Sequence, residues 1–213
     1  MRTEDLIQTL ARNVHAVPRH VIGQRIALGI LAGGSISLLL VSGILGIRPD
    51  LGAAMHDFAF WVRWVYTASL GIGAVLVTAS LARPESARLR WLWLLAIPVL
   101  LLTAIGIGEL AHARPQEWLT MWLGRNWRTC PWLVLLLSMP IFVGLLWSFR
   151  QFAPTRPRMA GAAAGLAAGA WSATLYCLHC PEVSAIFVLT WFSLGIGLAA
   201  VVGAVLGRQL LRW

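Results

Sequence analysis

Three cysteines and a histidine are the residues of this chain whose types and spacing could support chemistry. Cys177 and Cys180 stand three positions apart with His179 between them, in the stretch Tyr-Cys-Leu-His-Cys-Pro-Glu that ends at Glu182. Thiolate and imidazole groups bind soft or borderline metal cations, and the same thiols can pair or oxidise. The sequence therefore predicts a site for metal binding or thiol oxidation, made of Cys130, Cys177, His179, Cys180 and Glu182, with the first four as possible metal ligands.

A plainer interpretation of these residues stays open. Cys177 could be a small apolar residue that ends a helix, and His179 a polar residue in a short turn. An odd total of three cysteines is a poor fit to a disulfide framework. The predicted site requires no resident cofactor, because a heavy-metal ion would bind there only transiently.

The composition shows which kind of scaffold must position these groups. The chain has 213 residues, of which 59% are hydrophobic and 12% charged, whereas soluble domains are about 25% charged. This excludes an ordinary cytosolic enzyme, a disordered protein and a secreted disulfide-rich domain. Six segments are apolar and long enough to cross a bilayer: 26–47, 60–82, 91–111, 131–149, 159–178 and 184–207. We expect an all-α fold, a six-helix transmembrane bundle over residues 26–213 that follows a cytoplasmic segment, residues 1–25.

The distribution of arginines predicts how the bundle is oriented. All 17 basic residues are arginines, and twelve of them lie in the two tails and in the second and fourth connections. The other five lie in, or close to, the remaining connections. Because basic residues accumulate on the cytoplasmic side, both termini are expected in the cytoplasm and the three cysteines at the outer face of a bacterial inner membrane. The net charge of +9 then reflects orientation and needs no nucleic-acid partner.

Glycine spacing predicts close helix packing. Gly161, Gly165 and Gly169 form a stripe in the fifth segment, and pairs with the same spacing occur in the first and sixth segments. Small residues at this spacing let helix backbones approach one another in lipid. Such stripes serve packing within one chain or between chains, so they leave the oligomeric state open.

Charged residues inside the apolar segments are few. Arg63 falls near the outer end of the second segment and Glu109 near the outer end of the third, where they could pair or extend towards the interface. The sequence contains no series of acids or histidines across the bilayer, which disfavours a proton-coupled transporter.

The N-terminal segment has the pattern of a short amphipathic helix over residues 3–13. Thr3 can cap it, and the two acidic residues that follow fall in the first turn, where the helix dipole favours negative charge. Its apolar face consists of Leu6, Ile7, Leu10 and Val14. This face could contact the membrane surface, the bundle itself or a groove on a cytoplasmic protein.

Several stretches resemble the NrsF family, whose members are six-span inner-membrane negative regulators of an extracytoplasmic-function sigma factor. The stretches are Thr3-Glu4-Asp5-Leu6-Ile7 with Leu10-Ala11 and Pro18, Leu45-Gly46-x-Arg48-Pro49-Asp50-Leu51, Pro154-Thr155-Arg156-Pro157 before the glycine-rich segment, Leu178-His179-Cys180-Pro181-Glu182, and the C-terminal Gly203-x-x-x-Gly207-Arg208 with Leu210-Leu211-Arg212-Trp213. The resemblance extends over essentially the whole chain.

This resemblance implies an anti-sigma factor and not an enzyme. It implies that the N-terminal segment binds the sigma factor, through Glu4, Asp5, Leu6, Ile7, Leu10, Ala11 and Val14. It also implies that Cys130 and Cys180 respond to toxic metal or oxidative stress at the outer face, and that Cys177 is an addition to this pair.

A mechanism can be drawn from the order of the segments. Cys130 begins the fourth segment and Cys180 follows the fifth, so a hairpin of these two helices would bring both thiols to one membrane level. We expect that oxidation or metal binding there shifts the fifth helix along its glycine stripe and so releases the sigma factor.

Two other functions stay open at the level of sequence. One is a quinone-linked membrane thiol oxidoreductase that uses the Cys177-x-x-Cys180 pair, although its relay needs a second cysteine pair. The other is a small metal permease, although no metal-binding residues lie in the middle of the segments.

Overall fold

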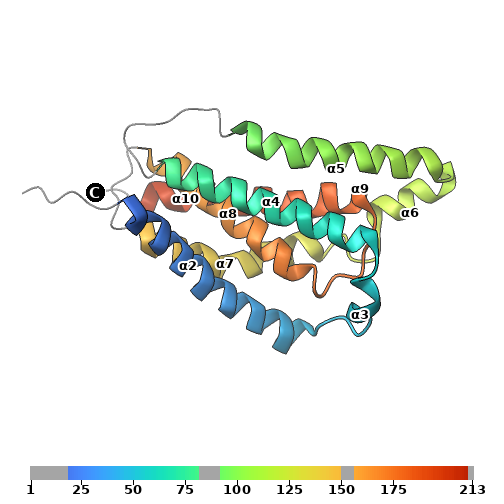
Figure 1. Ribbon diagram of the computed structural model, residues 1–213, viewed down its shortest axis with the longest axis horizontal. Helices are drawn as coiled ribbons and strands as arrows, with labels where there is room; N and C mark the ends of the chain where they lie inside the picture. The colour runs from blue at the N-terminus through green and yellow to red at the C-terminus, as the bar shows by residue number, and fades with distance from the viewer. Residues whose placement is uncertain (1–18, 82–91, 150–155, 211–213) are drawn as a thin grey trace, which may run out of the picture.

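The computed structural model describes residues 19–81, 92–149 and 156–210, and these ranges contain helices but no strand. Six long helices run side by side along the long axis of the molecule (Figure 1). They are α2 (Arg19–Leu40), α4 (Phe58–Leu81), α5 (Leu92–His112), α7 (Cys130–Phe149), α8 (Pro157–Tyr176) and α10 (Ser193–Leu210). A π-helical turn, η1 (Val41–Leu45), extends α2. The short helix α9 (Ala185–Phe187) and a second π-helical turn, η4 (Val188–Phe192), precede α10.

Five of these helices, each counted with its extensions, are long and apolar enough to span a membrane. Helices long and apolar enough to span a membrane are confirmed for the first, second, third, fourth and sixth segments. The fifth segment forms α8, which falls short of that level of hydropathy because glycine and alanine make up most of it. Thirteen of its 20 residues are buried by other helices, so few of its side chains could contact lipid.

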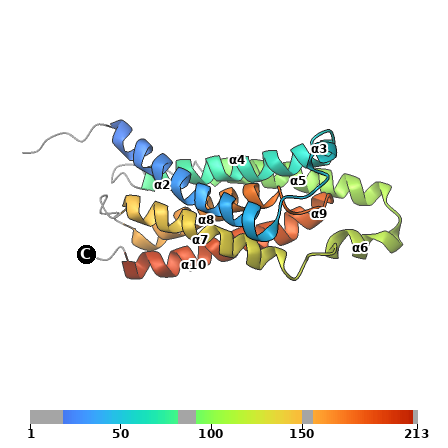
Figure 2. The same cartoon turned by 90° about the horizontal axis from the view of Figure 1, so that it is seen from below.

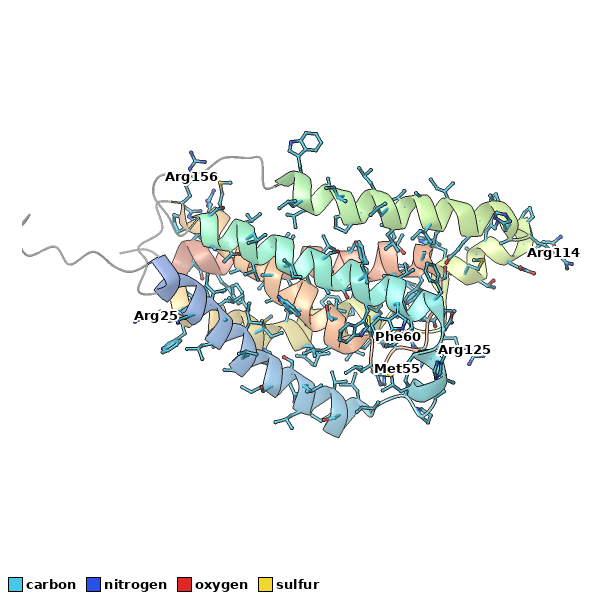
Figure 3. All side chains as sticks on the ribbon, in the orientation of Figure 1. Arg25, Met55, Phe60, Arg114, Arg125 and Arg156 are labelled. Atoms are coloured by element: carbon cyan, nitrogen blue, oxygen red, sulfur yellow. The ribbon has the colours of Figure 1, made fainter. Side chains whose placement is uncertain are left out.

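The connections at one end of the bundle bring the three cysteines together. These connections contain α3 (Leu51–Ala54), the pair η3 (Pro115–Glu117) and α6 (Trp118–Leu123), and residues 177–184. All lie at the right in Figure 1, and Figure 2 shows the same grouping from below. We call this the cysteine end. Arg114 and Arg125 lie there, whereas Arg25 and Arg156 lie at the opposite end (Figure 3).

Helix α8 forms the centre of the bundle and contacts α10, α4 and α7, while α2 packs mainly on α7. Glycines line these contacts. A Cβ atom on Gly165 would overlap the Ala199 carbonyl oxygen of α10, and one on Gly29 would lie 2.6 Å from the Gly144 carbonyl oxygen of α7. The predicted close packing of the glycine stripes is therefore confirmed, and it occurs within a single chain.

The helix bounds differ from the predicted segments mainly at the start. Helix α2 begins at Arg19, seven residues before the predicted start of the first segment. The predicted amphipathic helix over residues 3–13 lies outside the described residues.

Candidate functional site

The cysteine loop, which we define as residues 177–184, joins α8 to α9. The backbone N–H groups of His179 and Cys180 both donate to the Tyr176 carbonyl oxygen, at 3.0 Å, so the chain makes one more tight turn after the helix ends. Pro181 follows and cannot donate a backbone hydrogen bond, which ends the turn. The helical pattern resumes at Ala185.

All three thiols are buried in one hydrophobic cluster at the cysteine end. Cys130, Cys177 and Cys180 each have zero exposure, belong to the same cluster as Tyr176 and form no disulfide. Cys130 begins α7, and its backbone N–H donates to Asn126 O at 2.9 Å. The fold thus brings together residues that are far apart in the sequence, and it hides them from solvent and from lipid.

Cys180 lies in the same cluster as the other two thiols. Its thiol is close enough to Cys130 and to Cys177 to interact electrostatically with both. The Tyr176 hydroxyl lies beside Cys130 and Cys180, and it is buried without a well-formed hydrogen bond. Burial raises the pKa of Cys180, although the nearby Arg63 charge opposes this effect. The thiol is therefore protonated at neutral pH and weakly reactive in this conformation.

Arg63 attaches the cysteine loop to α4. Its Nη1 group donates to the carbonyl oxygens of Cys180, at 3.3 Å, and of Glu182. The side chain is only 1% exposed, and its guanidinium carbon lies 5.8 Å from the centre of the Phe60 ring. It neither pairs with Glu109 nor extends to the interface, the two roles expected from the sequence. Glu109 instead accepts a hydrogen bond of 2.8 Å from the Ala185 backbone N–H, at the start of α9.

His179 and its neighbour attach the loop to the first helix. The Nδ1 atom of His179 lies 2.8 Å from the Gly46 carbonyl oxygen, and the Arg48 N–H donates to the Leu178 carbonyl oxygen at 3.1 Å. Gly46 ends η1 with a φ of 83°, which favours glycine over residues with a Cβ atom. We call this pair of hydrogen bonds the α2 latch.

Glu182 holds the loop to the connection that precedes α7. Its Oε1 atom accepts a hydrogen bond of 2.7 Å from the Arg125 backbone N–H. The neighbouring Gly124 has a φ of 54°. A Cβ atom there would also lie 2.7 Å from Glu182 Oε2, so the close approach needs glycine.

The four predicted metal ligands are not arranged as a metal site. In the part of the chain that the structure describes, no three His, Cys, Asp or Glu side chains are grouped so that they could hold a metal ion. The Nδ1 atom of His179 lies against the Gly46 carbonyl oxygen. Glu182 accepts a hydrogen bond from the Arg125 backbone N–H, although its charge is still within electrostatic reach of Cys130 and Cys180.

The candidate sigma-binding residues Glu4, Asp5, Leu6, Ile7, Leu10, Ala11 and Val14 lie outside the described residues. Helix α2, which follows them in the chain, is held to α7 over much of its length. The Ser37 hydroxyl donates to the Leu137 carbonyl oxygen at 2.8 Å, and the Ser148 hydroxyl donates to the Arg25 carbonyl oxygen at 2.9 Å.

Comparisons with known proteins identify the group to which this bundle belongs. The profile of the family NrsF, described as "Negative regulator of sigma F", matches residues 10–213. This chain belongs to the NrsF family. It is 42% identical over 214 residues to the "Probable anti-sigma-F factor NrsF" of Azospira oryzae, and 40% identical over 215 residues to the "Anti-sigma-F factor NrsF" of Caulobacter vibrioides. Each alignment covers all of both chains. No solved structure matches this chain significantly.

The predicted NrsF resemblance is therefore confirmed, and it places the chain in a family described as a negative regulator. Sequence reasoning missed three parts of the cysteine end: the attachment of the loop by Arg63, the α2 latch and the place of Tyr176 beside the thiols. The attachment by Arg63 could have been suspected from the sequence, because an arginine inside an apolar segment usually has a buried polar partner. The latch joins two of the stretches that carried the resemblance.

Proposed function

We propose that this protein is a membrane-embedded anti-sigma factor that sequesters an extracytoplasmic-function sigma factor in the cytoplasm. The observation that carries this proposal is the match to the NrsF family over residues 10–213, together with relatives named as anti-sigma-F factors at 40–42% identity over their whole length. The binding segment is the N-terminal tail, with Glu4, Asp5, Leu6, Ile7, Leu10, Ala11 and Val14 as its contact residues.

The proposed setting is the bacterial inner membrane, with six spans and both termini in the cytoplasm. Five helices have the required length and hydropathy. The one remaining span is α8, formed by the fifth segment, which runs beside the other helices through the centre of the bundle (Figures 1 and 2). The arginine count supports this orientation and leaves the cysteine end outside.

The proposed signal is oxidation of Cys130 and Cys180 to a disulfide. The two thiols lose two protons and two electrons, which pass to a two-electron oxidant of the peroxide class, and an S–S bond forms. Their common burial beside Tyr176 supports this pairing. A heavy-metal ion bound by the same two thiols is the other signal that the family resemblance implies.

The proposed route to the N-terminal tail runs through α2. The α2 latch ties the cysteine loop to the end of η1, and the glycine contacts between α2 and α7 tie the same helix to the element that begins at Cys130. A bond between Cys130 and Cys180 pulls on both attachments at once. Helix α2 then moves as a rigid body and alters the tail that precedes Arg19.

Membrane pull-down of the sigma factor tests the binding claim. Replacing Leu6 and Leu10 with Asp should abolish capture, because both would place charge on the apolar face. Replacing Gln8 and Thr9 with Asp changes the charge equally on the other face and should leave capture intact. Capture by the Leu6 and Leu10 variant at the wild-type level would refute the proposed binding segment.

Oxidant-induced release of the sigma factor tests the signal and the route. Cys130→Ser and Cys180→Ser should each prevent release, while the exposed Ser35→Ala on α2 should not. His179→Ala should retain sigma binding but weaken the release, because the side-chain hydrogen bond of the latch is lost and only the backbone one remains. Normal release from both serine variants would refute the cysteine sensor, and normal release from His179→Ala would refute the route.

A further inference from the structure

The guanidinium of Arg63 is a buried charge whose hydrogen-bonding capacity is only partly used. Its Nη1 group bonds to the cysteine loop, but Nε and Nη2 are buried and have no hydrogen-bond partner. In the described residues the single ion pair is Arg48–Asp50, so no carboxylate neutralises Arg63 there. Burying an unpaired charge costs several kcal/mol, and charges retained in apolar surroundings usually serve a function.

Two buried thiols lie near this charge. The guanidinium lies within electrostatic reach of the Cys177 and Cys180 sulfur atoms. Thr67, one turn further along α4, also lies beside Cys177. Arg63 is therefore placed where negative charge would appear if these sulfur atoms reacted.

The turn after α8 also places Cys177 for reaction with Cys180. The two residues are three positions apart in a helical turn that is closed by hydrogen bonds to the Tyr176 carbonyl oxygen. Side chains at this spacing lie on one face, roughly 5–6 Å apart at Cβ, and a disulfide needs Cβ atoms about 3.5–4.5 Å apart. By these typical values, a disulfide needs the two Cβ atoms to come roughly 1–2 Å closer. Cys180 can thus pair with Cys130 on α7 or with Cys177 in its own turn.

We propose that Cys177 is an exchange thiol, and that Arg63 positions it and stabilises the charge on the reacting sulfur atoms. This inference rests on the proposed Cys130–Cys180 disulfide. In the exchange, the Cys177 sulfur attacks the Cys180 sulfur, the Cys177–Cys180 bond forms and the Cys130–Cys180 bond breaks. Cys130 leaves as a thiolate and takes up the proton that Cys177 released. The number of disulfides is unchanged, so the step needs no oxidant or reductant.

The exchange would end the mechanical signal without reducing the protein. The first disulfide links the cysteine loop to α7, whereas the second lies within the loop and links no separate helices. Cys130 is returned to its free state while the oxidation is retained in the loop. An oxidant would therefore cause only a transient release signal, while the Cys177–Cys180 disulfide would persist afterwards.

A time course of disulfide mapping tests the proposal. The full-length protein in membranes is oxidised with diamide, quenched with acid and N-ethylmaleimide, and digested for mass spectrometry. In the wild type we expect the Cys130–Cys180 peptide first and the Cys177–Cys180 peptide later. Arg63→Gln should slow this conversion by about tenfold or more, the effect of roughly one pKa unit of charge stabilisation, whereas Arg63→Lys should keep most of the rate.

Two further variants separate the possible outcomes. Arg128→Gln removes an exposed arginine at the same end and should leave the conversion rate unchanged. Cys177→Ser should accumulate the Cys130–Cys180 disulfide and retain it, a result that does not depend on the folding of the Arg63 variants. A Cys177 that stays free in the wild type, or an unchanged rate in a folded Arg63→Gln, would overturn the exchange. Absence of the Cys130–Cys180 disulfide from the wild type would overturn the proposed function instead.

Discussion

Helices α8 and α5 have nearly the same length, 20 and 21 residues, but they differ in how much of their surface the bundle buries. Helix α8 lies at the centre, and thirteen of its residues are buried. Helix α5 lies at the edge (Figure 1), where only 17% of its apolar span is buried and its contacts are with α4, α9 and η4. A cavity of about 590 Å³ with an apolar lining separates it in part from α4.

This difference shows what hydropathy measures in a membrane bundle. Most of the surface of α5 is exposed outside the bundle, and this helix is strongly apolar, whereas α8 is covered by protein and consists largely of small residues. Close backbone contact replaces the hydrophobic effect as the source of stability there. The four predictions that follow test this contrast, from the largest expected effect to the smallest.

Enlarging a glycine of the α8–α10 contact should have the largest effect. In Gly165→Leu the new side chain would overlap the Ala199 carbonyl oxygen, a backbone atom that cannot move aside. We expect a loss of about 3 kcal/mol or more, which would be observed as a loss of monodisperse protein in size-exclusion chromatography after mild detergent extraction. The control is Gly197→Leu on α10, the other helix of this contact, because a Cβ atom at Gly197 would have no atom within 4 Å. Normal recovery of Gly165→Leu would contradict the close contact.

Two adjacent leucines of α5 test whether this helix is held by one narrow face. Leu102 is 2% exposed, whereas Leu101 is 62% exposed. Leu102→Ala should cost about 2–3 kcal/mol through the cavity it leaves, and Leu101→Ala less than about 0.5 kcal/mol. Thermal unfolding in one detergent measures both. Equal losses would mean that α5 is packed more evenly than the structure indicates.

At the contact between α2 and α7, the addition of a single methyl group should already lower the stability. Gly29→Ala adds a Cβ atom 2.6 Å from the Gly144 carbonyl oxygen and 2.9 Å from Ser148 Oγ. We expect a loss of about 1–3 kcal/mol. Gly34→Ala has no atom within 4 Å and should be neutral or slightly stabilising, because alanine favours the helix. A neutral Gly29→Ala would restrict the glycine argument to α8 and α10.

The ion pair at the cysteine end should contribute least. Arg48 lowers the pKa of Asp50, and the pair is joined by hydrogen bonds of 2.6 and 2.8 Å. A lowered carboxyl pKa contributes stability that is present above the unfolded-state pKa and is lost as the pH falls through the folded-state pKa. Asp50→Asn should therefore lower Tm only slightly at pH 7, since Asp50 is exposed.

The same variant should match the wild type only at a pH below the lowered folded-state pKa of Asp50, where the aspartate is protonated and as uncharged as the asparagine that replaces it. Thermal unfolding at the two pH values measures the difference. A larger effect than that of Gly29→Ala would mean that charge, and not close packing, dominates the stability of this bundle.

Much of the fold follows from local properties of the sequence. Long apolar segments separated by polar connections predict helices that span a bilayer, because a backbone in lipid must satisfy its own hydrogen bonds. The glycine spacing predicts close contacts, and five of the six segments meet the criteria for a span in the structure. Helix α8 shows the limit of this reasoning, because its position at the centre of the bundle depends on the helices packed against it, mainly α10, α4 and α7.

At the cysteine end, too, some features follow from the sequence and others only from the tertiary structure. The sequence by itself determined the residue types, the tight spacing of Cys177 and Cys180, and the family to which these stretches point. Only the tertiary structure decided that Arg63 would face the loop, that His179 would reach Gly46, and that all three thiols would be buried together. Those contacts join residues separated by 117 and 133 positions. They depend on how five helices pack, and no local pattern carries that information.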